Sequence, residues 1–166
     1  MKGFKSIIRA IALTLALAAI LSLVACGNDG EGGGSANGRV TIVVEIAKDD
    51  YIEYVAEMNN VKDSSEGVLS VIKYLAARAG DSLTYTLGNG PDGAGLSSIC
   101  DLRPASDEVI AVYTSVGADA ARPPLGQTGV ASIEYGGNTL ILSGKSLAEM
   151  TASDGAVILF RLENAE

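Results

Sequence analysis

The sequence predicts an α+β domain, in which a mixed, mostly antiparallel sheet packs on one helix. Two observations predict it. A single stretch, residues 68–79, repeats its apolar side chains at helical spacing, and several shorter runs rich in β-branched residues are bounded by turn-forming residues. A helix and a sheet that each carry one apolar side bury both by packing together, which gives a two-layer domain.

The helix is the best-defined element. From Val68, apolar residues recur at i+1, i+4, i+7, i+8 and i+11, which places them on one face of an α-helix. Asp63 followed by Glu66 has the form of a capping box and predicts where the helix begins. Gly80 follows the last apolar position as a C-cap.

The strands are predicted from short β-rich runs between turn signals. Residues 51–61 alternate less cleanly, and the sequence leaves them open as strand or irregular chain. The Gly-rich stretch 88–95 is predicted to be a loop, and 121–126 must be one because consecutive prolines cannot donate to a sheet. Glycines between two runs predict a hairpin over 132–142. The predicted strands are residues 40–46, 83–87, 108–116, 132–135, 139–142 and 156–162.

The first 25 residues are predicted to be a secretory signal peptide. Three basic residues and no acidic one precede an uncharged run from Ala10 to Cys26, which is the pattern of such peptides. The run ends Leu23-Val24-Ala25-Cys26, which resembles the lipobox of bacterial lipoproteins. The resemblance implies cleavage before Cys26 and lipidation of its thiol. An uncleaved transmembrane helix is the alternative, because the run is also long enough to span a bilayer.

The chain that follows Cys26 is rich in glycine up to residue 38 and has no large apolar side chain. We therefore expect residues 26–38 to be a lipidated tether, with an r.m.s. reach of roughly 20 Å. Residues 39–166 are long enough for a single domain with one core. The expected location is outside the cytoplasm, lipid-anchored to the bacterial membrane.

Composition argues against several classes of function. Without the signal, nine basic residues stand against 20 acidic ones, and such a surface repels nucleic-acid phosphates and anionic lipid. The chain has no His, which removes Ser-His-Asp and Cys-His nucleophile systems and the commonest metal ligand. With Cys26 acylated, Cys100 has no disulfide partner and is expected to be a buried thiol. We expect no metal site and no nucleic-acid partner.

Four segments follow one another along the chain: residues 40–46, the helix entry 65–72 (SEGVLSVI), residues 110–116 (IAVYTSV) and residues 154–160 (DGAVILF). In this order they resemble bacterial surface lipoprotein domains related to the C-terminal domain of transcobalamin and intrinsic factor. The resemblance covers most of residues 40–162. It implies a β-grasp-like fold, with a sheet cradling the helix, and a role in holding ligands or partners rather than in catalysis.

The chain departs from these relatives in two places. It has no Trp, where relatives often carry one in the strand matching residues 109–115, and it has an insertion-like stretch at 117–129. A cobalamin-like ligand is what the family would imply for a site. Because fold does not carry function with it, the resemblance is one of fold more than of site, and no cofactor is predicted.

Two short motifs match known sites in letters only. Residues 88–93 read G-x-G-x-x-G, but the dinucleotide fingerprint needs a helix to open there, and Pro91 interrupts the loop. Ser70 and Lys73 form S-x-x-K, the nucleophile motif of penicillin-recognising enzymes. Ser70 is already within the predicted helix, and neither S-D-N nor K-T-G is present. Both side chains are expected on the exposed face of the helix.

The predicted function is a membrane-anchored extracytoplasmic binding module that is not an enzyme. Its ligand-binding residues are predicted to be Tyr113, Thr114 and Ser115, together with Tyr85, because phenols and hydroxyls on strands can line a recognition surface. The predicted partners are the membrane, through the lipid, and a small ligand or a surface protein.

Two other functions stay open. A small cell-wall glycan hydrolase would need two carboxylates about 5–9 Å apart, such as Glu134 with Asp107 or Glu108. An accessory subunit would dock a larger surface complex by adding a strand at a sheet edge. Clustered carboxylates in a cleft would favour the hydrolase, an uncovered edge strand would favour docking, and a concave pocket would favour a ligand binder.

Replacing Cys26 by Ser is expected to abolish lipid attachment, because the acyl group is carried on the thiol. Metabolic labelling with a palmitate analogue measures this directly, and Cys100→Ser, which leaves the lipobox intact, should still be labelled. Label in the Cys26→Ser protein would refute the lipoprotein prediction.

Overall fold

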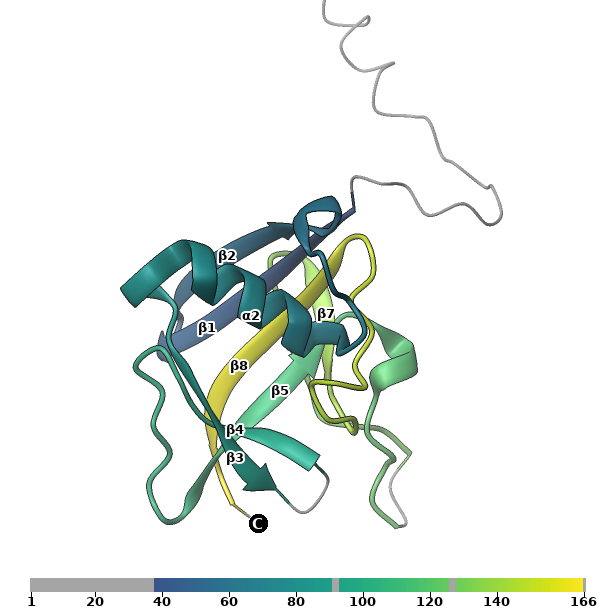
Figure 1. Cartoon of the computed structure of the whole chain (residues 1–166). Helices are drawn as coiled ribbons and strands as arrows, with labels where there is room; N and C mark the ends of the chain where they lie inside the picture. Colours follow the sequence, from purple (N-terminus) through teal and green to yellow (C-terminus); the bar gives the residue numbers. More distant parts are fainter. Residues whose placement is uncertain (1–37, 91–92, 126–127, 166) are drawn as a thin grey trace, which may run out of the picture. The chain divides into compact units, whose positions relative to one another are not determined.

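The computed structural model describes residues 38–90, 93–125 and 128–165. In this part of the chain one α-helix lies against a six-stranded mixed sheet, and a two-stranded hairpin lies beside them (Figure 1). The predicted α+β class with one helix is thus confirmed. Cys26 and most of the predicted tether lie outside the described residues. No described helix is both long and apolar enough to cross a membrane.

The sheet is built around its first and last strands. Its order is β2-β1-β8-β5-β7-β6. At the centre β1 (Arg39–Ala47) and β8 (Ala156–Asn164) run parallel, whereas the other pairings are antiparallel. Strands buried on both faces carry continuous apolar runs rather than alternating ones, as both do here. The remaining strands of the sheet are β2 (Asp50–Glu57), β5 (Glu108–Thr114), β6 (Ser132–Tyr135) and β7 (Asn138–Leu142).

The helix α2 (Gly67–Ala79) covers one face of the sheet. Its predicted apolar face is buried against alternate residues of the two central strands, and the C-cap Gly80 donates its N–H to the carbonyl of Ala76. Burial of a large aliphatic side chain contributes about 1.5–3 kcal/mol, so this face holds the helix in place. The helix and the two central strands thus share one hydrophobic cluster, whose main members are Val40, Ile42, Val68, Ile72, Ile158 and Phe160.

The predicted capping box is wrong. Glu66 is the N-cap, and no side chain bonds the first-turn N–H groups; the Asp63 carboxylate bonds within its own turn instead. The N–H of Val68 donates to the carbonyl of Met150 at 3.3 Å. A backbone segment far along the chain therefore satisfies the groups that a cap would otherwise bond.

The predicted loop over residues 88–95 is also wrong. Strands β3 (Tyr85–Gly90) and β4 (Gly93–Ile99) form an antiparallel hairpin, in which Gly88 lies opposite Gly95 and Gly90 opposite Gly93. Glycine is unfavourable in strands, because it has more conformational freedom to lose on folding and has no side chain to pack. Here backbone pairing between two neighbouring runs outweighs that local preference.

Other predicted boundaries shift little. The hairpin of β6 and β7 is confirmed, with positive φ at Gly136 and Gly137 (56° and 79°), as a two-residue type I′ turn requires. Residues 51–61, left open by the sequence, are strand β2 followed by a short 3-10 turn (Met58–Asn60). Gly38, assigned to the tether, is buried, and its carbonyl accepts the N–H of Met58 at 2.7 Å.

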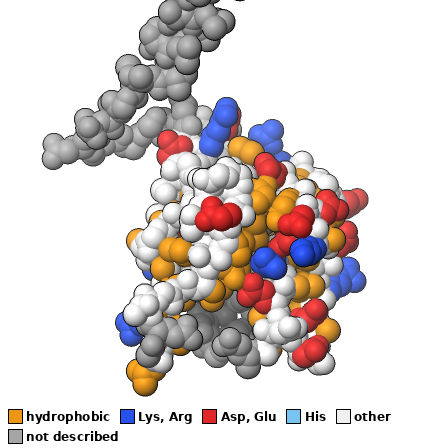
Figure 2. Space-filling view, turned by 180° about the vertical axis from the view of Figure 1, so that it is seen from behind, with side chains coloured by type: hydrophobic (Ala, Val, Ile, Leu, Met, Phe, Trp, Pro, Cys, Tyr) orange, Lys and Arg blue, Asp and Glu red, His pale blue; other side chains and the backbone are white. Residues whose placement is uncertain are grey.

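The sheet curls, so that its two edge strands meet on the side opposite the helix. Tyr51 of β2 and Tyr135 of β6 pack edge to face, with ring centroids 4.8 Å apart. The Tyr135 hydroxyl also donates to the Glu53 carboxylate. Seen from this side, hydrophobic side chains form a band flanked by charged ones (Figure 2). A second hydrophobic cluster lies inside the curl, and its buried residues are Val43, Ala111, Tyr113, Leu140 and Leu159.

Replacing Gly67 by Ala is expected to destabilise the domain strongly. Its φ is +51°, and a Cβ there would lie 2.1 Å from the Met150 carbonyl oxygen. Gly136→Ala is the matched control, because its φ is +56° and no atom lies within 4 Å of the added Cβ. We expect urea unfolding to show a loss of about 1–2 kcal/mol for the control, which is the cost of the left-handed conformation, and about 3 kcal/mol or more for Gly67→Ala. Equal losses would show that the close approach to Met150 does not constrain the helix.

Candidate functional site

Strand β5 has a strand neighbour along its whole length on one side only. It pairs with β8 from Glu108 to Thr114. On its other side, β7 pairs only with Tyr113 and Thr114. Among the described residues, the first five positions of β5 (108–112) therefore have no strand beside them on that side.

In this open stretch every second residue points its N–H and C=O away from β8. Ser115 donates its N–H to the carbonyl of Val157 on β8, and in an antiparallel pair every second residue bonds the same neighbour. The residues between them point the other way, which includes Ile110. The bond from the Ser143 N–H to the Val112 carbonyl, at 2.8 Å, confirms this direction. The open stretch thus presents main-chain donors and acceptors where a further strand would lie.

A groove of about 570 Å³ occupies the place of the missing strand. Residues 109–112 of β5 line one side of it, and residues from the stretches 121–124 and 130–131 and from the end of β7 line the other. Its volume falls in the range of small-molecule and peptide sites, about 300–1,000 Å³. Val109 is 45% exposed in this groove. The apolar residues that line it include Val109, Ala111, Pro124, Val130 and Leu142.

Charged side chains lie at the two ends of the groove. Arg122 and Lys145 belong to the segments beside the last residues of β7, near Val112. Glu163 lines the other end, opposite Val109 in the β5–β8 pair. Within the described part of the chain, Arg122 forms no ion pair. The groove is thus apolar along its length and basic at one end. At the other end the Glu163 carboxylate is 3.5 Å from the Arg161 guanidinium and accepts the Tyr113 hydroxyl.

A buried carboxylate fixes the basic end of the groove. Asp119 is fully buried and accepts the N–H and the hydroxyl of Thr151, at 2.7 and 3.1 Å. It also accepts the Lys145 ammonium at 2.8 Å, and its carbonyl accepts the N–H of Gly144 at 3.0 Å. Because each of its carboxylate oxygens is bonded, Asp119 holds residues 143–145 in one position against the short 3-10 turn at Gly117–Asp119.

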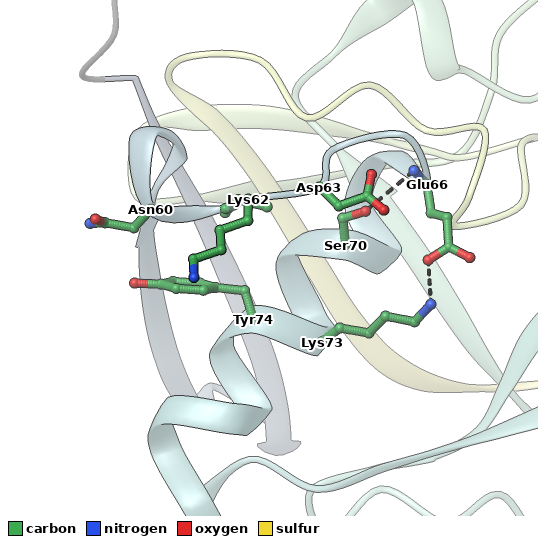
Figure 3. Close-up of a pocket in the computed structure, with 8 residues that line it drawn as sticks. Asn60, Lys62, Asp63, Glu66, Ser70, Lys73 and Tyr74 are labelled. Carbon is green, nitrogen blue, oxygen red and sulfur yellow. Dashed lines mark hydrogen bonds and ion pairs between the residues drawn. The ribbon is translucent and has the colours of Figure 1, made fainter.

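A second pocket, of about 400 Å³, lies between residues 60–66 and α2 (Figure 3). It contains the S-x-x-K residues, and two of its charged groups, Lys73 and Glu66, pair with each other. The Lys73 ammonium pairs with the Glu66 carboxylate, and this hydrogen bond raises the pKa of Lys73. The residues that line the pocket are Asn60, Val61, Lys62, Asp63, Glu66, Ser70, Lys73 and Tyr74.

The serine of this motif is not placed as a nucleophile. Ser70 is 5% exposed, so the expectation that it lies on the exposed helix face is wrong, while Lys73 is exposed. The Ser70 hydroxyl accepts the N–H of Glu66 at 3.2 Å, and the Lys73 side chain extends toward the Glu66 carboxylate instead (Figure 3). A lysine kept protonated by a carboxylate cannot serve as the base that activates a serine.

Two of the four predicted ligand-binding residues, Tyr113 and Thr114, are buried in the sheet, and Ser115 and Tyr85 are half-buried. Tyr113 is 3% exposed, and its hydroxyl donates to Glu163 at 2.7 Å; burial and this bond raise its pKa to about 12. The hydroxyls of Thr114 and Ser115 accept backbone N–H groups at 3.0 Å. Tyr85 packs with the cluster on the helix side, whereas Tyr113 belongs to the cluster on the opposite side. The structure therefore does not bring Tyr85 and Tyr113 together, and none of the four lines a described pocket.

The carboxylates considered for a hydrolase bond within their own turns. Glu134 accepts the Thr139 hydroxyl at 2.7 Å across the β6–β7 hairpin, and Glu108 accepts the N–H of Ala105 at 2.9 Å. Neither of them, nor Asp107, lines a described pocket. Over the residues that the structure covers, no group of three or more Cys, Asp or Glu is placed to hold a metal ion.

The predicted buried thiol is only half-buried. Cys100 lies in the turn after β4, with a φ of 50°, rather than within a strand. Its sulfur is 3.5 Å from the Tyr54 hydroxyl. The pKa of Tyr54 is raised to about 12, mainly by burial and secondly by this contact.

The sequence did not identify the residues that line the groove. Its only signal was the insertion-like stretch at 117–129, which supplies Arg122 and Pro124 to one wall. Val109 and Ala111 read as ordinary strand residues, because nothing local shows that β7 ends beside Tyr113. No family model matches this chain, and a comparison with curated proteins also gives no match.

Removing the Asp119 carboxylate is expected to destabilise the domain, because Lys145 and Thr151 lose their shared partner. We expect Asp119→Ala to lower the free energy of unfolding by about 3 kcal/mol, as for other broken buried pairs. Asp81→Ala, at an exposed position, should change it by less than about 0.5 kcal/mol. Chemical unfolding measures both, and similar values for the two variants would show that Asp119 does not fix the wall.

Proposed function

We propose that this chain is a membrane-anchored extracytoplasmic lipoprotein that acts as a non-enzymatic binding module, with its binding site in the groove beside β5. The observation that carries the proposal is an apolar groove in the position where a strand would continue the sheet. Binding sites in proteins are commonly concave and apolar, with a few polar groups that fix orientation. Arg122, Lys145 and Glu163 supply such groups here.

The sequence supports the anchored location. A basic start, an uncharged apolar run and a lipobox-like ending at Cys26 occur in the order of a lipoprotein signal. The Gly-rich residues that follow lead directly to Gly38, where the contacts of the domain begin. A lipid on Cys26 would hold the groove at the membrane surface, within reach of ligands or proteins outside the cytoplasm.

The fold we propose is of the β-grasp type. The β1–β2 hairpin is followed by a helix that lies across the sheet, and the last strand returns to the centre beside the first. This arrangement has the sheet cradling one helix, as the resemblance to transcobalamin-related lipoprotein domains implies. Binding rather than hydrolysis is favoured because Glu134 and Glu108 are engaged in local hydrogen bonds.

Thermal-shift screening of residues 38–166 tests the proposal, since both hydrophobic clusters lie within residues 40–162. Peptides, glycans and small apolar compounds would be screened. A ligand at a hundredfold excess over its Kd stabilises by about 2.7 kcal/mol. We expect Val109→Glu to abolish the shift, because it places a charge in the apolar groove.

The matched control is Val55→Glu. Val55 is a strand valine that is 53% exposed on β2, and it does not line the groove. It should keep the full shift. If both variants lose the shift, or if both keep it, the binding site is not the groove beside Val109. Cleavage of cell-wall glycan with no compound that shifts the melting curve would replace the proposal with the hydrolase.

A further inference from the structure

We infer that the groove binds an extended peptide segment of a partner protein, which adds to the sheet as a strand beside β5 and antiparallel to it. The inference rests on the proposed function and gives its site a ligand class. It depends on three properties of the groove: the main-chain groups that β5 presents there, the apolar side chains on both sides of them, and the basic side chains at one end.

Main-chain groups are the first argument. The alternation set by the Ser115–Val157 bond turns the N–H and C=O of Ile110 toward the groove, where β7 does not extend to pair with them. Buried or half-buried main-chain groups are normally paired, because leaving them unbonded costs free energy. A peptide backbone beside β5 offers a donor and an acceptor at the spacing of a sheet, whereas an apolar small molecule would leave both groups unpaired.

Side chains are the second argument. Successive residues of β5 point to opposite faces of the sheet, so Val109 and Ala111 flank the groove on one face and Ile110 and Val112 on the other. A strand laid beside them would find apolar neighbours on both faces. Val109, the most exposed of the four, would be covered by such a strand. The recognised segment should therefore be apolar on at least one of its faces.

Charge and direction are the third argument. Both neighbours of β5 run antiparallel to it, so a peptide that continues along the path of β7 would start near Val112 and end near Val109. Its start then lies beside Arg122 and Lys145, and its end beside Glu163. Complementary charges set register and orientation in such complexes. Because Glu163 already faces Arg161, the basic end sets the charge preference. The segment that fits best therefore has an acidic residue before its apolar stretch.

A second copy of this chain fits the groove less well. After removal of the signal, acidic residues outnumber basic ones by 20 to nine. Two domains of that net charge repel each other. A partner segment with its own balanced charges carries no such penalty, so a separate protein is the occupant we favour.

Fluorescence anisotropy with a labelled synthetic peptide tests the inference on the full-length chain in detergent. The probe is a heptapeptide of alternating valine and threonine between an N-terminal glutamate and a C-terminal lysine. Two N-methylated versions carry methyl groups on alternate amides, one version on each edge of the peptide. Strand addition uses one edge only, so one version should bind about tenfold more weakly and the other like the parent.

Variants of the chain locate the binding. Val109→Glu should weaken peptide binding by about tenfold or more, and Val55→Glu by less than about twofold. Arg122→Glu should weaken binding of the parent peptide and should restore binding of a peptide whose N-terminal glutamate is replaced by lysine. Arg103→Glu is the matched control, because Arg103 is exposed and lines no described pocket.

Several results would overturn strand addition while the binding function survives. Equal affinity of the two N-methylated peptides is one, and Val109-dependent binding of an anilinonaphthalene sulfonate dye without any peptide binding is another. Val109-dependent dimerisation of the chain would make a second copy the occupant. If neither peptide nor dye binds in a Val109-dependent way, the inference and the proposed site fall together.

Discussion

The parallel pairing of β1 with β8 is the constraint on which the rest of the structure depends. These strands come from the two ends of the domain, and their pairing places Ile42 opposite Ile158 and Val44 opposite Phe160. Strands β1 and β8 are each buried on both faces of the sheet, so they supply side chains to the cluster under the helix and to the cluster inside the curl. Closing so long a loop costs chain entropy, which the burial of two apolar strands offsets.

The entry to both central strands is held by a small set of hydrogen bonds. The N–H of Arg39 donates to the Asp154 carboxylate at 2.9 Å, and the N–H of Gly155 donates to the Arg39 carbonyl at 2.8 Å. The first residue of β1 and the turn before β8 are thereby fixed to each other. Once β8 lies at the centre, β5 can pair along its free side, and the position of the groove follows from where β7 stops.

An open stretch of β5 would be a hazard if it were fully exposed, because unpaired strand edges template aggregation. Here residues of the stretches 121–125 and 128–131 line the open side, with prolines at positions 123 and 124 and with Arg122 and Lys145 at one end of the opening. Prolines and charges are common devices against unwanted edge pairing. In the binding mode that we propose, the basic end of the groove would favour a strand that begins with an acidic residue.

The two faces of the sheet separate Tyr85 from Tyr113, which the sequence grouped as ligand-binding residues. Tyr51 and Tyr135 join the two edge strands through ring packing, and Tyr135 donates to Glu53. This contact helps to enclose Tyr113, which therefore serves the fold rather than a surface. The phenols thus stabilise the second cluster, while the accessible apolar surface lies further along β5.

The sequence by itself determined the elements whose stability is local. The helix follows from the spacing of its apolar residues, and the β6–β7 turn follows from two glycines that tolerate positive φ. The tertiary structure alone decided what depends on distant neighbours: the Met150 carbonyl in place of a capping side chain, the Gly-rich strands β3 and β4, and the groove beside Val109. The physical reason is that local conformational preference is written in neighbouring residues, whereas burial and strand pairing are set by groups that only folding brings together.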